Sequence, residues 1–273
     1  MKAWRLDRLG GILRYEEAQF LLGITAGPAG KSLQEDWRDG TLAEYAHVPK
    51  SCVTQIEGLG GLSVAELSVL PRFAVPYGGL VRGRLAAGET IVITGATGAY
   101  GSAAVLLSLA LGAARVVAAG RNGKVLDALA KLGGARVATA ALSGDVEPDA
   151  KALRAAAGGG AQMAFDMVGS AQDPNATLAA LKSLRRGGRL VLMGSMAVPL
   201  PISYLDVMLS NLEIIGQFMY PQDTFMRLID LARAGLLDLR AIRARPFPLE
   251  GLPAAMEAAA TSDALECIVV TPS

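Results

Sequence analysis

A glycine-rich turn between an apolar strand and an alanine-rich helix most constrains the fold of this chain. Residues 90–94 are all β-branched and apolar at the three central positions, as is typical of a buried parallel strand, and Gly95-Ala96-Thr97-Gly98-Ala99-Tyr100-Gly101 follows them. Glycines in such a turn permit a sharp bend, a close approach of backbone to phosphate and tight packing of helix on strand. We therefore expect the start of the next helix to hold the pyrophosphate of a dinucleotide. The alternative is a tight turn without a ligand, because the first glycine gap is one residue wider than in the usual G-x-G-x-x-G pattern.

From residue 90 onward, strand and helix patterns alternate regularly. The expected strands are residues 90–94, 115–119, 136–139, 163–168, 189–193 and 212–217. The expected helices are residues 100–111, 123–132, 148–157 and 174–184. Six strands that alternate with helices predict an α/β fold with a doubly wound parallel sheet, the Rossmann arrangement.

Shorter elements are expected on both sides of this pattern. The first part of the chain has strand-like pieces at residues 2–6, 12–16 and 42–49. Two helices, 62–70 and 77–85, are expected to be separated by Pro71 and Pro76. Beyond the sheet, we expect helices over 224–234 and 252–260 and strands over 242–247 and 265–270.

Composition excludes several classes of function. The formal net charge is +1, which gives no electrostatic reason to expect a nucleic acid or an anionic membrane as partner. Cys52 and Cys267 are the only cysteines, so there is no disulfide framework. The first eight residues carry charges where a signal peptide needs an apolar core, and the most apolar window, 103–120, is interrupted by polar residues. We therefore expect a cytoplasmic protein.

Arg121 follows the second predicted strand, about 20 residues after the glycine turn, where many NAD sites have an acid that binds the ribose 2′-hydroxyl. A cation at this place suits a 2′-phosphate, so the expected cofactor is NADP(H). The alternative is that Arg121 is a solvated cation in a loop.

Several motifs together resemble the medium-chain dehydrogenase/reductase superfamily, in particular its alcohol-dehydrogenase-like and quinone-oxidoreductase-like members. The motifs are the glycine turn, Gly120-Arg121-Asn122, Phe165-Asp166-Met167-Val168-Gly169, the segment 187–195 and the segment 249–270. The resemblance covers roughly residues 40–273 and touches the first 17.

The resemblance implies a division into two domains, with two departures from the family. Residues 76–244 are expected to form the Rossmann domain, and residues 1–75 and 245–273 a shortened, partly β remnant of a GroES-like catalytic domain. Most of the family's barrel is expected to be deleted near Ala18–Leu22. The zinc motifs are also missing, since His47 is the only histidine, and neither a catalytic nor a structural zinc site can be built from it and two cysteines.

The resemblance also implies which residues bind the cofactor. The cofactor-binding residues are expected to be Gly95, Thr97, Gly98, Ala99, Tyr100, Gly101, Arg121, Asn122, Met167, Val168, Gly169, Gly194, Ser195 and Met196. Without zinc, a hydroxyl has to supply or polarise the proton. Tyr77 is the first candidate for this catalytic role, and Ser195 and Tyr220 are weaker ones. Asp166 is expected to be a hydrogen-bond acceptor at a strand end, and His47 a surface residue.

These observations favour a zinc-independent, NADP(H)-dependent oxidoreductase acting on a small aldehyde, ketone, quinone or enone. An NADP(H)-binding protein with little or no catalysis is the alternative, because most of the substrate domain is missing. A short-chain dehydrogenase would also have this glycine turn, but it needs a Tyr-x-x-x-Lys pair, which no tyrosine here provides. The apolar strand 212–217 resembles the edge strand through which family members dimerise, so a homodimer is expected.

Overall fold

The computed structural model describes residues 11–13, 42–43, 45 and 53–271. They fall into two compact units: residues 75–218, and residues 1–74 together with 219–273. The sequence-based division places these boundaries after residues 75 and 244, and that assignment of domains stays a prediction. The expected strand at 2–6, most of those at 12–16 and 42–49, His47, Cys52 and the expected deletion near Ala18–Leu22 lie outside the described residues.

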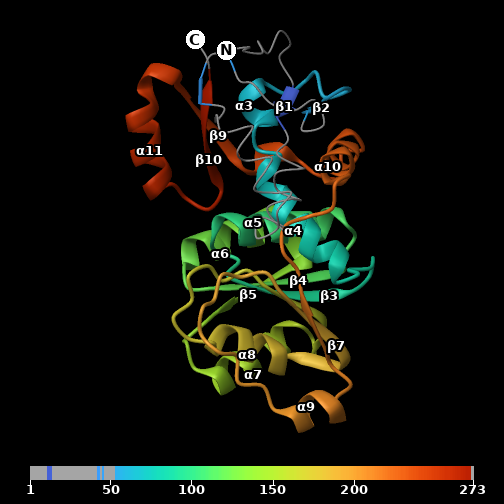
Figure 1. The fold of residues 1–273 in the computed structure, drawn as a ribbon. Coiled ribbons are helices and arrows are strands. Elements are labelled where there is room, and N and C mark those ends of the chain that lie inside the picture. Colours follow the sequence, from blue (N-terminus) through green and yellow to red (C-terminus); the bar gives the residue numbers. More distant parts are fainter. Residues whose placement is uncertain (1–10, 14–41, 44, 46–52, 272–273) are drawn as a thin grey trace, which may run out of the picture. The chain divides into compact units, whose positions relative to one another are not determined.

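The unit 75–218 is built on a six-stranded parallel sheet with the order β5-β4-β3-β6-β7-β8, which confirms the predicted Rossmann fold (Figure 1). The strands are β3 (Thr90–Thr94), β4 (Arg115–Gly120), β5 (Val137–Ala141), β6 (Ala161–Asp166), β7 (Leu184–Leu192) and β8 (Glu213–Gly216). The order changes direction between β3 and β6, and ligands of open α/β sheets bind at the carboxyl ends of strands beside such a point.

Helices cover both faces of this sheet (Figure 1). One face carries α5 (Ala99–Ala110) and α6 (Gly123–Gly133), and the other carries α7 (Val146–Ala156) and α8 (Asn175–Lys182). Beneath α7 and α8 lies a core of fully buried aliphatic side chains that includes Val92, Leu153 and Leu190. Burial of such side chains on both faces explains why the strands read as continuous apolar runs rather than as alternating ones.

Two predicted boundaries were wrong because glycine and proline were given too much weight. Strand β7 begins at Leu184 rather than at residue 189: Gly187, at φ +73°, and a register shift against β6 interrupt the strand without ending it. The expected break between two helices ends at Pro71, where α4 (Pro71–Arg82) begins, and α4 then runs through Pro76 instead of beginning after it. A proline in the first turn forfeits no helical hydrogen bond.

The loss at Pro76 is limited to one hydrogen bond, and packing supports α4 along its length. Phe73 and Leu80 are fully buried. A Cβ on Gly79 would lie 2.5 Å from the Phe165 ring, and one on Gly83 would lie 2.4 Å from the Met163 side chain. The two glycines thus let the second half of the helix pack closely on β6. Before it, α3 (Val64–Leu67) is a single turn with a Ser63–Glu66 capping box.

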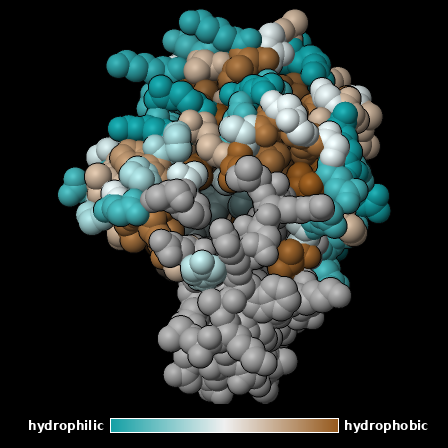
Figure 2. All heavy atoms as spheres, turned by 90° about the horizontal axis from the view of Figure 1, so that it is seen from above, coloured by the Kyte–Doolittle hydropathy of each residue, from teal (hydrophilic) through white to brown (hydrophobic). Residues whose placement is uncertain are grey.

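The second unit contains two small sheets. In one, β9 (Arg243–Pro248) and β10 (Glu266–Thr271) are parallel, and in the other, β1 (Gly11–Leu13) and β2 (Val53–Gln55) are antiparallel. Helices α10 (Thr224–Arg233) and α11 (Leu252–Thr261) agree with their predicted positions within one residue at each end. Among the coloured residues of Figure 2, hydrophobic and hydrophilic side chains are interspersed, as on most protein surfaces.

The short helix α9 (Tyr204–Leu209), which the sequence did not predict, follows β7 in the first unit. No described helix combines the length and the apolar character needed to cross a lipid bilayer.

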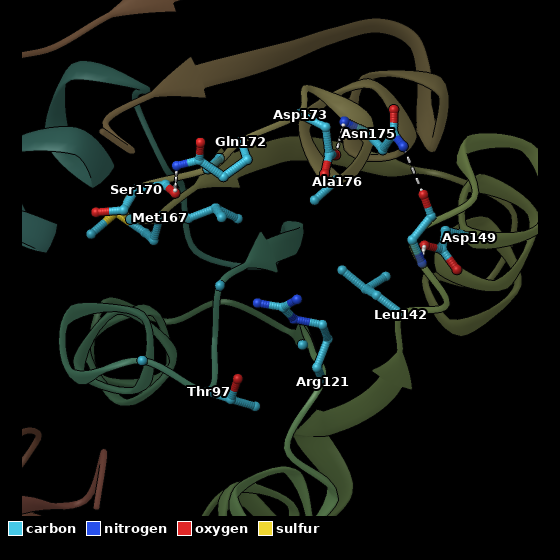
Figure 3. A pocket seen from close by; sticks show the side chains of 17 residues that line it. Thr97, Arg121, Leu142, Asp149, Met167, Ser170, Gln172, Asp173, Asn175 and Ala176 are labelled. Atoms are coloured by element: carbon cyan, nitrogen blue, oxygen red, sulfur yellow. Dashed lines mark hydrogen bonds between the residues drawn. The ribbon is translucent and has the colours of Figure 1, made fainter. Parts of the chain in front are cut away.

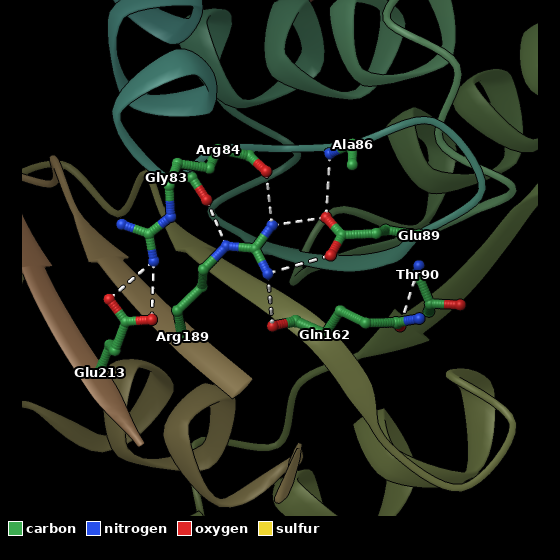
Figure 4. Close-up of polar contacts among 8 residues, drawn as sticks. All are labelled: Gly83, Arg84, Ala86, Glu89, Thr90, Gln162, Arg189 and Glu213. Carbon is green, nitrogen blue, oxygen red and sulfur yellow. Dashed lines mark hydrogen bonds and ion pairs between the residues drawn. The ribbon is translucent and has the colours of Figure 1, made fainter. Parts of the chain in front are cut away.

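One buried arginine ties four segments of the first unit together at the amino end of the sheet (Figure 4). Arg189 of β7 donates to the main-chain oxygens of Gly83, Arg84 and Gln162 and to both carboxylate oxygens of Glu89. The Arg189 side chain is 9% exposed and that of Glu89 is 19% exposed. Burial by itself would raise the pKa of Glu89, but the hydrogen bonds from Arg189 and the Ala86 N–H outweigh burial and lower it.

We predict that Glu89→Gln lowers the free energy of unfolding at pH 7 by about 1.5–3 kcal/mol, the usual contribution of hydrogen bonds to a charged partner. The pKa of Glu89 is lower in the folded than in the unfolded chain, so its contribution is complete above the unfolded value of 4.5 and is lost as the pH falls through the folded value. Urea unfolding at pH 7 and below pH 4 measures this: the two proteins should converge in acid. Glu213→Gln is the control, because the Arg84–Glu213 pair is about half exposed and should contribute less than about 1 kcal/mol.

Candidate functional site

The glycine turn after β3 is held by contacts between backbone atoms. Gly95 has φ +69°, and a Cβ there would lie 2.6 Å from the Met167 carbonyl oxygen. A Cβ on Gly101 would lie 2.0 Å from the carbonyl oxygen of Gly95. Only glycine fits at these two positions, the first because of conformation and space and the second because helix α5 crosses directly over the turn.

Helix α5 begins without a side chain over its first N–H groups. Its N-cap is Gly98, which makes no side-chain cap hydrogen bond, and Tyr100 in the first turn is 47% exposed. The N–H groups of the first turn cannot be paired inside the helix, and the helix dipole makes this end positive. Beyond the Gly95 oxygen at 3.4 Å, a Cβ on Gly98 would meet no other atom within 4 Å. The main chain is therefore open to an anion at this place.

A cavity of about 390 Å³ lies at the carboxyl ends of the central strands (Figure 3). Its lining comes from the turns after β3, β4, β5 and β6, which meet at the point where the strand order reverses. The lining residues are Gly95, Thr97, Gly98, Gly120, Arg121, Leu142, Gly144, Asp149, Met167, Val168, Gly169, Ser170, Ala171, Gln172, Asp173, Asn175 and Ala176. A cavity of this size in this position is typical of a small-molecule site.

Arg121 points its guanidinium group into the cavity (Figure 3). It follows β4 directly and is exposed. Within the described part of the chain it has neither a carboxylate within 4 Å nor a hydrogen-bond acceptor, whereas Arg189, Arg233 and Arg240 are each paired. An arginine without a partner in a cavity is available to a phosphate or carboxylate of a ligand.

The ends of β6 and β7 lie side by side at the far end of the predicted site. Gly169 and Ser195 form an isolated parallel bridge, the Ser195 N–H donates to Val168 O over 3.1 Å, and the Ser170 N–H donates to Ser195 Oγ over 2.9 Å. A Cβ on Gly194 would lie 2.5 Å from Val168 O. The structure thus brings Val168, Gly169, Gly194 and Ser195 together, as the sequence predicts.

Asp166 supports this strand end from inside the sheet. The carboxylate is 2% exposed and accepts hydrogen bonds from Thr94 Oγ1 (2.9 Å), Thr177 Oγ1 (3.0 Å) and Val168 N (3.2 Å). Burial raises the pKa of Asp166, and the three hydrogen bonds oppose that rise. The carboxylate of Asp166 therefore serves the fold by accepting hydrogen bonds from neighbouring residues. This agrees with the prediction that Asp166 is a hydrogen-bond acceptor at a strand end.

The predicted site residues fall into two groups. Seven line the cavity: Gly95, Thr97, Gly98, Arg121, Met167, Val168 and Gly169. Among the others, Ala99, Tyr100 and Gly101 open helix α5, and Asn122 caps α6 by accepting from Val125 N at 3.4 Å. Gly194, Ser195 and Met196 follow β7, and Tyr77 is half-buried in α4 outside the lining. The roles of all these residues stay predictions.

Sequence reasoning missed one wall of the cavity. Leu142, Gly144 and Asp149 come from the turn after β5 and the start of α7. Gln172 and Asp173 come from the loop before α8, and Asn175 begins that helix. The rule that ligands bind at the carboxyl ends of strands could have found them, because β5 lies next but one to β3 in the usual Rossmann strand order, which this sheet has.

The described residues do not fit a zinc ion. Zinc sites are built from histidine, cysteine and carboxylate groups. No cluster of three or more such groups occurs among residues 53–271 or the other described positions, and the whole chain has one histidine and two cysteines.

The parallel sheet, the reversal of strand order and the glycine turn define a Rossmann-type α/β protein. The family model described as zinc-binding dehydrogenase matches residues 99–234. A putative D-xylulose reductase of Agrobacterium fabrum is 29% identical over 213 residues, which cover 76% of this chain and 58% of that protein. The chain belongs to the medium-chain zinc-binding dehydrogenase family.

Solved structures show the same fold. Alcohol dehydrogenase TADH from Thermus sp. ATN1 has a TM-score of 0.72 at 25% identity, covering 85% of this chain and 66% of that one. A putative zinc-binding dehydrogenase of Sinorhizobium meliloti 1021 bound to NADP has a TM-score of 0.69 at 23% identity, with 86% and 66% covered. An E. coli CFT073 alcohol dehydrogenase complexed with NADH has a TM-score of 0.72 at 19% identity, with 85% and 66% covered. The chain spans about three-fifths of the length of the curated relatives that it matches.

Proposed function

We propose that this chain is an NAD(P)-dependent oxidoreductase of the alcohol and polyol dehydrogenase type, with NADP(H) as its cofactor. The observation that carries the proposal is the cavity at the carboxyl ends of β3 to β6, which combines the glycine turn with the unpaired Arg121. A relative such as the sorbitol dehydrogenase of Bacillus subtilis, 27% identical, supports the reaction class, and related folds hold NADH or NADP. We infer a small aldehyde, ketone, quinone or enone as the oxidised substrate.

The chain's own residues fit a dinucleotide along the cavity. The turn from Gly95 to Gly98 and the open first turn of α5 offer main-chain N–H groups to a pyrophosphate. Arg121, with Asn122 beside it, offers a cation to the 2′-phosphate of the adenosine ribose. The joined ends of β6 and β7 would flank the nicotinamide. When bound, the nicotinamide supplies the hydride, and the protein orients it and limits its exposure to water.

We also propose that a hydroxyl group of the chain donates the proton to the substrate. Tyr77 of α4 is the first candidate, and Ser195 and Tyr220 are weaker ones. Ser195 already accepts the Ser170 N–H, which leaves its hydroxyl hydrogen available to another acceptor. We propose that the reaction uses such a hydroxyl and not zinc, because the donor groups of the described residues do not form a zinc site.

Binding of NADP(H) without turnover is the second candidate function. It is favoured by the composition of the cavity wall, all of which comes from the unit 75–218. The two functions differ only in whether a substrate can be reduced, so the same protein sample can distinguish them.

We also propose a homodimer formed through the edge strand 212–217. Among the strands that the structure describes, β8 is the last of the sheet and pairs with β7 alone. Ile214 is 36% exposed, and the preceding α9 exposes Leu205 and Leu209 by 59% and 61%. Pairing two copies along β8 would satisfy its free main-chain groups and cover these side chains. Size-exclusion chromatography with light scattering should give twice the monomer mass of 28.2 kDa, and a monomer at micromolar concentration would contradict the proposal.

Replacement of Arg121 tests the choice of cofactor. We expect Arg121→Asp to weaken NADPH binding at least tenfold and NADH binding much less, because a charge-assisted contact with phosphate contributes about 1.5–3 kcal/mol. Fluorescence titration of both cofactors measures the two dissociation constants. Arg186→Asp makes the same charge change in the first part of β7 and should leave both constants unchanged. Equal losses for NADPH and NADH in Arg121→Asp would refute the role of Arg121.

Steady-state oxidation of NADPH with a panel of aldehydes, ketones, quinones and enones tests the activity. We expect turnover with at least one class, undiminished by prolonged treatment with a zinc chelator, and a fall in kcat in Tyr77→Phe. Tight binding of NADPH without turnover on any substrate would select the second candidate function. Loss of turnover on chelation, restored by added zinc, would contradict zinc independence.

A further inference from the structure

The turn after β5 forms part of the cavity wall near Arg121. Leu142 points into the cavity from this turn (Figure 3), and its N–H donates to Gly120 O over 3.0 Å. Its side chain packs against the apolar core under α7 and α8. The start of the turn is therefore fixed to the end of β4, directly beside Arg121.

Asp149, in the first turn of α7, holds the middle of the turn from one side. Its side chain is nearly fully buried, and its carboxylate accepts the Ser143 N–H at 2.8 Å, Ser143 Oγ at 2.8 Å and the Gly144 N–H at 3.0 Å. Three donors on one carboxyl group make a strong, directional set of hydrogen bonds. They account for the burial of a carboxylate that has no cation as partner among the contacts of the described residues.

Asn175, in the first turn of α8, holds the same turn from the other side. Its Nδ2 donates to Gly144 O over 2.9 Å, and its own N–H donates to Asp173 Oδ1 over 2.9 Å. Both polar main-chain atoms of Gly144 are thus occupied, the N–H by a side chain of α7 and the oxygen by a side chain of α8. Gly144 has φ +98°, and a Cβ there would meet no atom within 4 Å, so the backbone conformation and not the space requires glycine.

We propose that Asp149 and Asn175 are positioning residues that act through Gly144 to hold the Leu142 wall in place for the adenosine half of the dinucleotide. The inference rests on the proposed function. Neither residue needs to contact the ligand for this role: the pair couples the turn after β5 to the loop after β6, which are the two sides of the cavity next to Arg121. When either hydrogen-bonded side is lost, Gly144 is free to reorient and the wall is no longer preformed.

Binding of NADPH and of 2′,5′-ADP, which contains only the adenosine half, tests the proposal. We expect Asp149→Ala and Asn175→Ala each to weaken both ligands by the same factor, roughly tenfold, because the lost wall belongs to the half that they share. The affinity of Asp149→Asn for both ligands should lie between those of the wild type and Asp149→Ala. Its remaining side-chain oxygen can still accept from Ser143, while its amide nitrogen faces the Gly144 N–H. The double Ala variant should weaken binding by less than the product of the single effects, because both side chains act on one residue.

The control is Glu147→Gln, which removes an exposed carboxylate from the same helix, where it pairs with Lys182, and should leave both affinities unchanged. Urea unfolding of each variant separates positioning from loss of fold, and Asn175→Ala, which leaves the buried carboxylate intact, keeps the test valid if Asp149→Ala does not fold. Unchanged binding in Asn175→Ala, or weaker NADPH binding with unchanged 2′,5′-ADP binding, would overturn the inference. If the wild-type protein binds neither ligand, the proposed function itself has failed.

Discussion

The structure depends on three backbone segments that meet without side chains between them at the start of α5. Gly101 brings the helix onto the carbonyl of Gly95, and Gly95 brings the turn onto Met167 at the end of β6. This contact fixes the helix start relative to two neighbouring strands at the point where the sheet order reverses. The cavity, its open helix N-terminus and the joined ends of β6 and β7 all take their positions from it.

Main chain and side chains have different tasks around the cavity. Peptide groups of the glycine turn and of the uncapped start of α5 form an open surface, and their geometry is set by packing. Most polar side chains nearby serve the fold: Asp166 and Asp149 each accept three hydrogen bonds from neighbouring groups. Arg121 is different, because no described group competes for its charge. An open helix N-terminus with one unpaired arginine in the same cavity is the physical basis for proposing that a phosphate-rich cofactor binds there.

Local signals in the sequence were sufficient for the sheet and for seven of the seventeen residues that line the cavity. Strand β3 and the start of α6 were predicted to the residue, because apolar runs, glycines and caps fall in register there. The continuation of β7 through Gly187 and of α4 through Pro76 could not be predicted, since packing against β6 decides both. The wall at Leu142, Gly144 and Asp149 was missed for a related reason. Its residues carry no motif and meet the glycine turn only in three dimensions.

The freedom of Arg121 has a consequence for how such proteins diversify. Residues that hold the fold can change only with compensation elsewhere, as the glycines of the turn illustrate. Arg121 stabilises nothing in the described chain, so exchange for a neutral or acidic residue would cost the native state little. On the proposed role of Arg121 in binding the 2′-phosphate, a single substitution there would change the preference between NADP(H) and NAD(H) while the architecture stays unchanged.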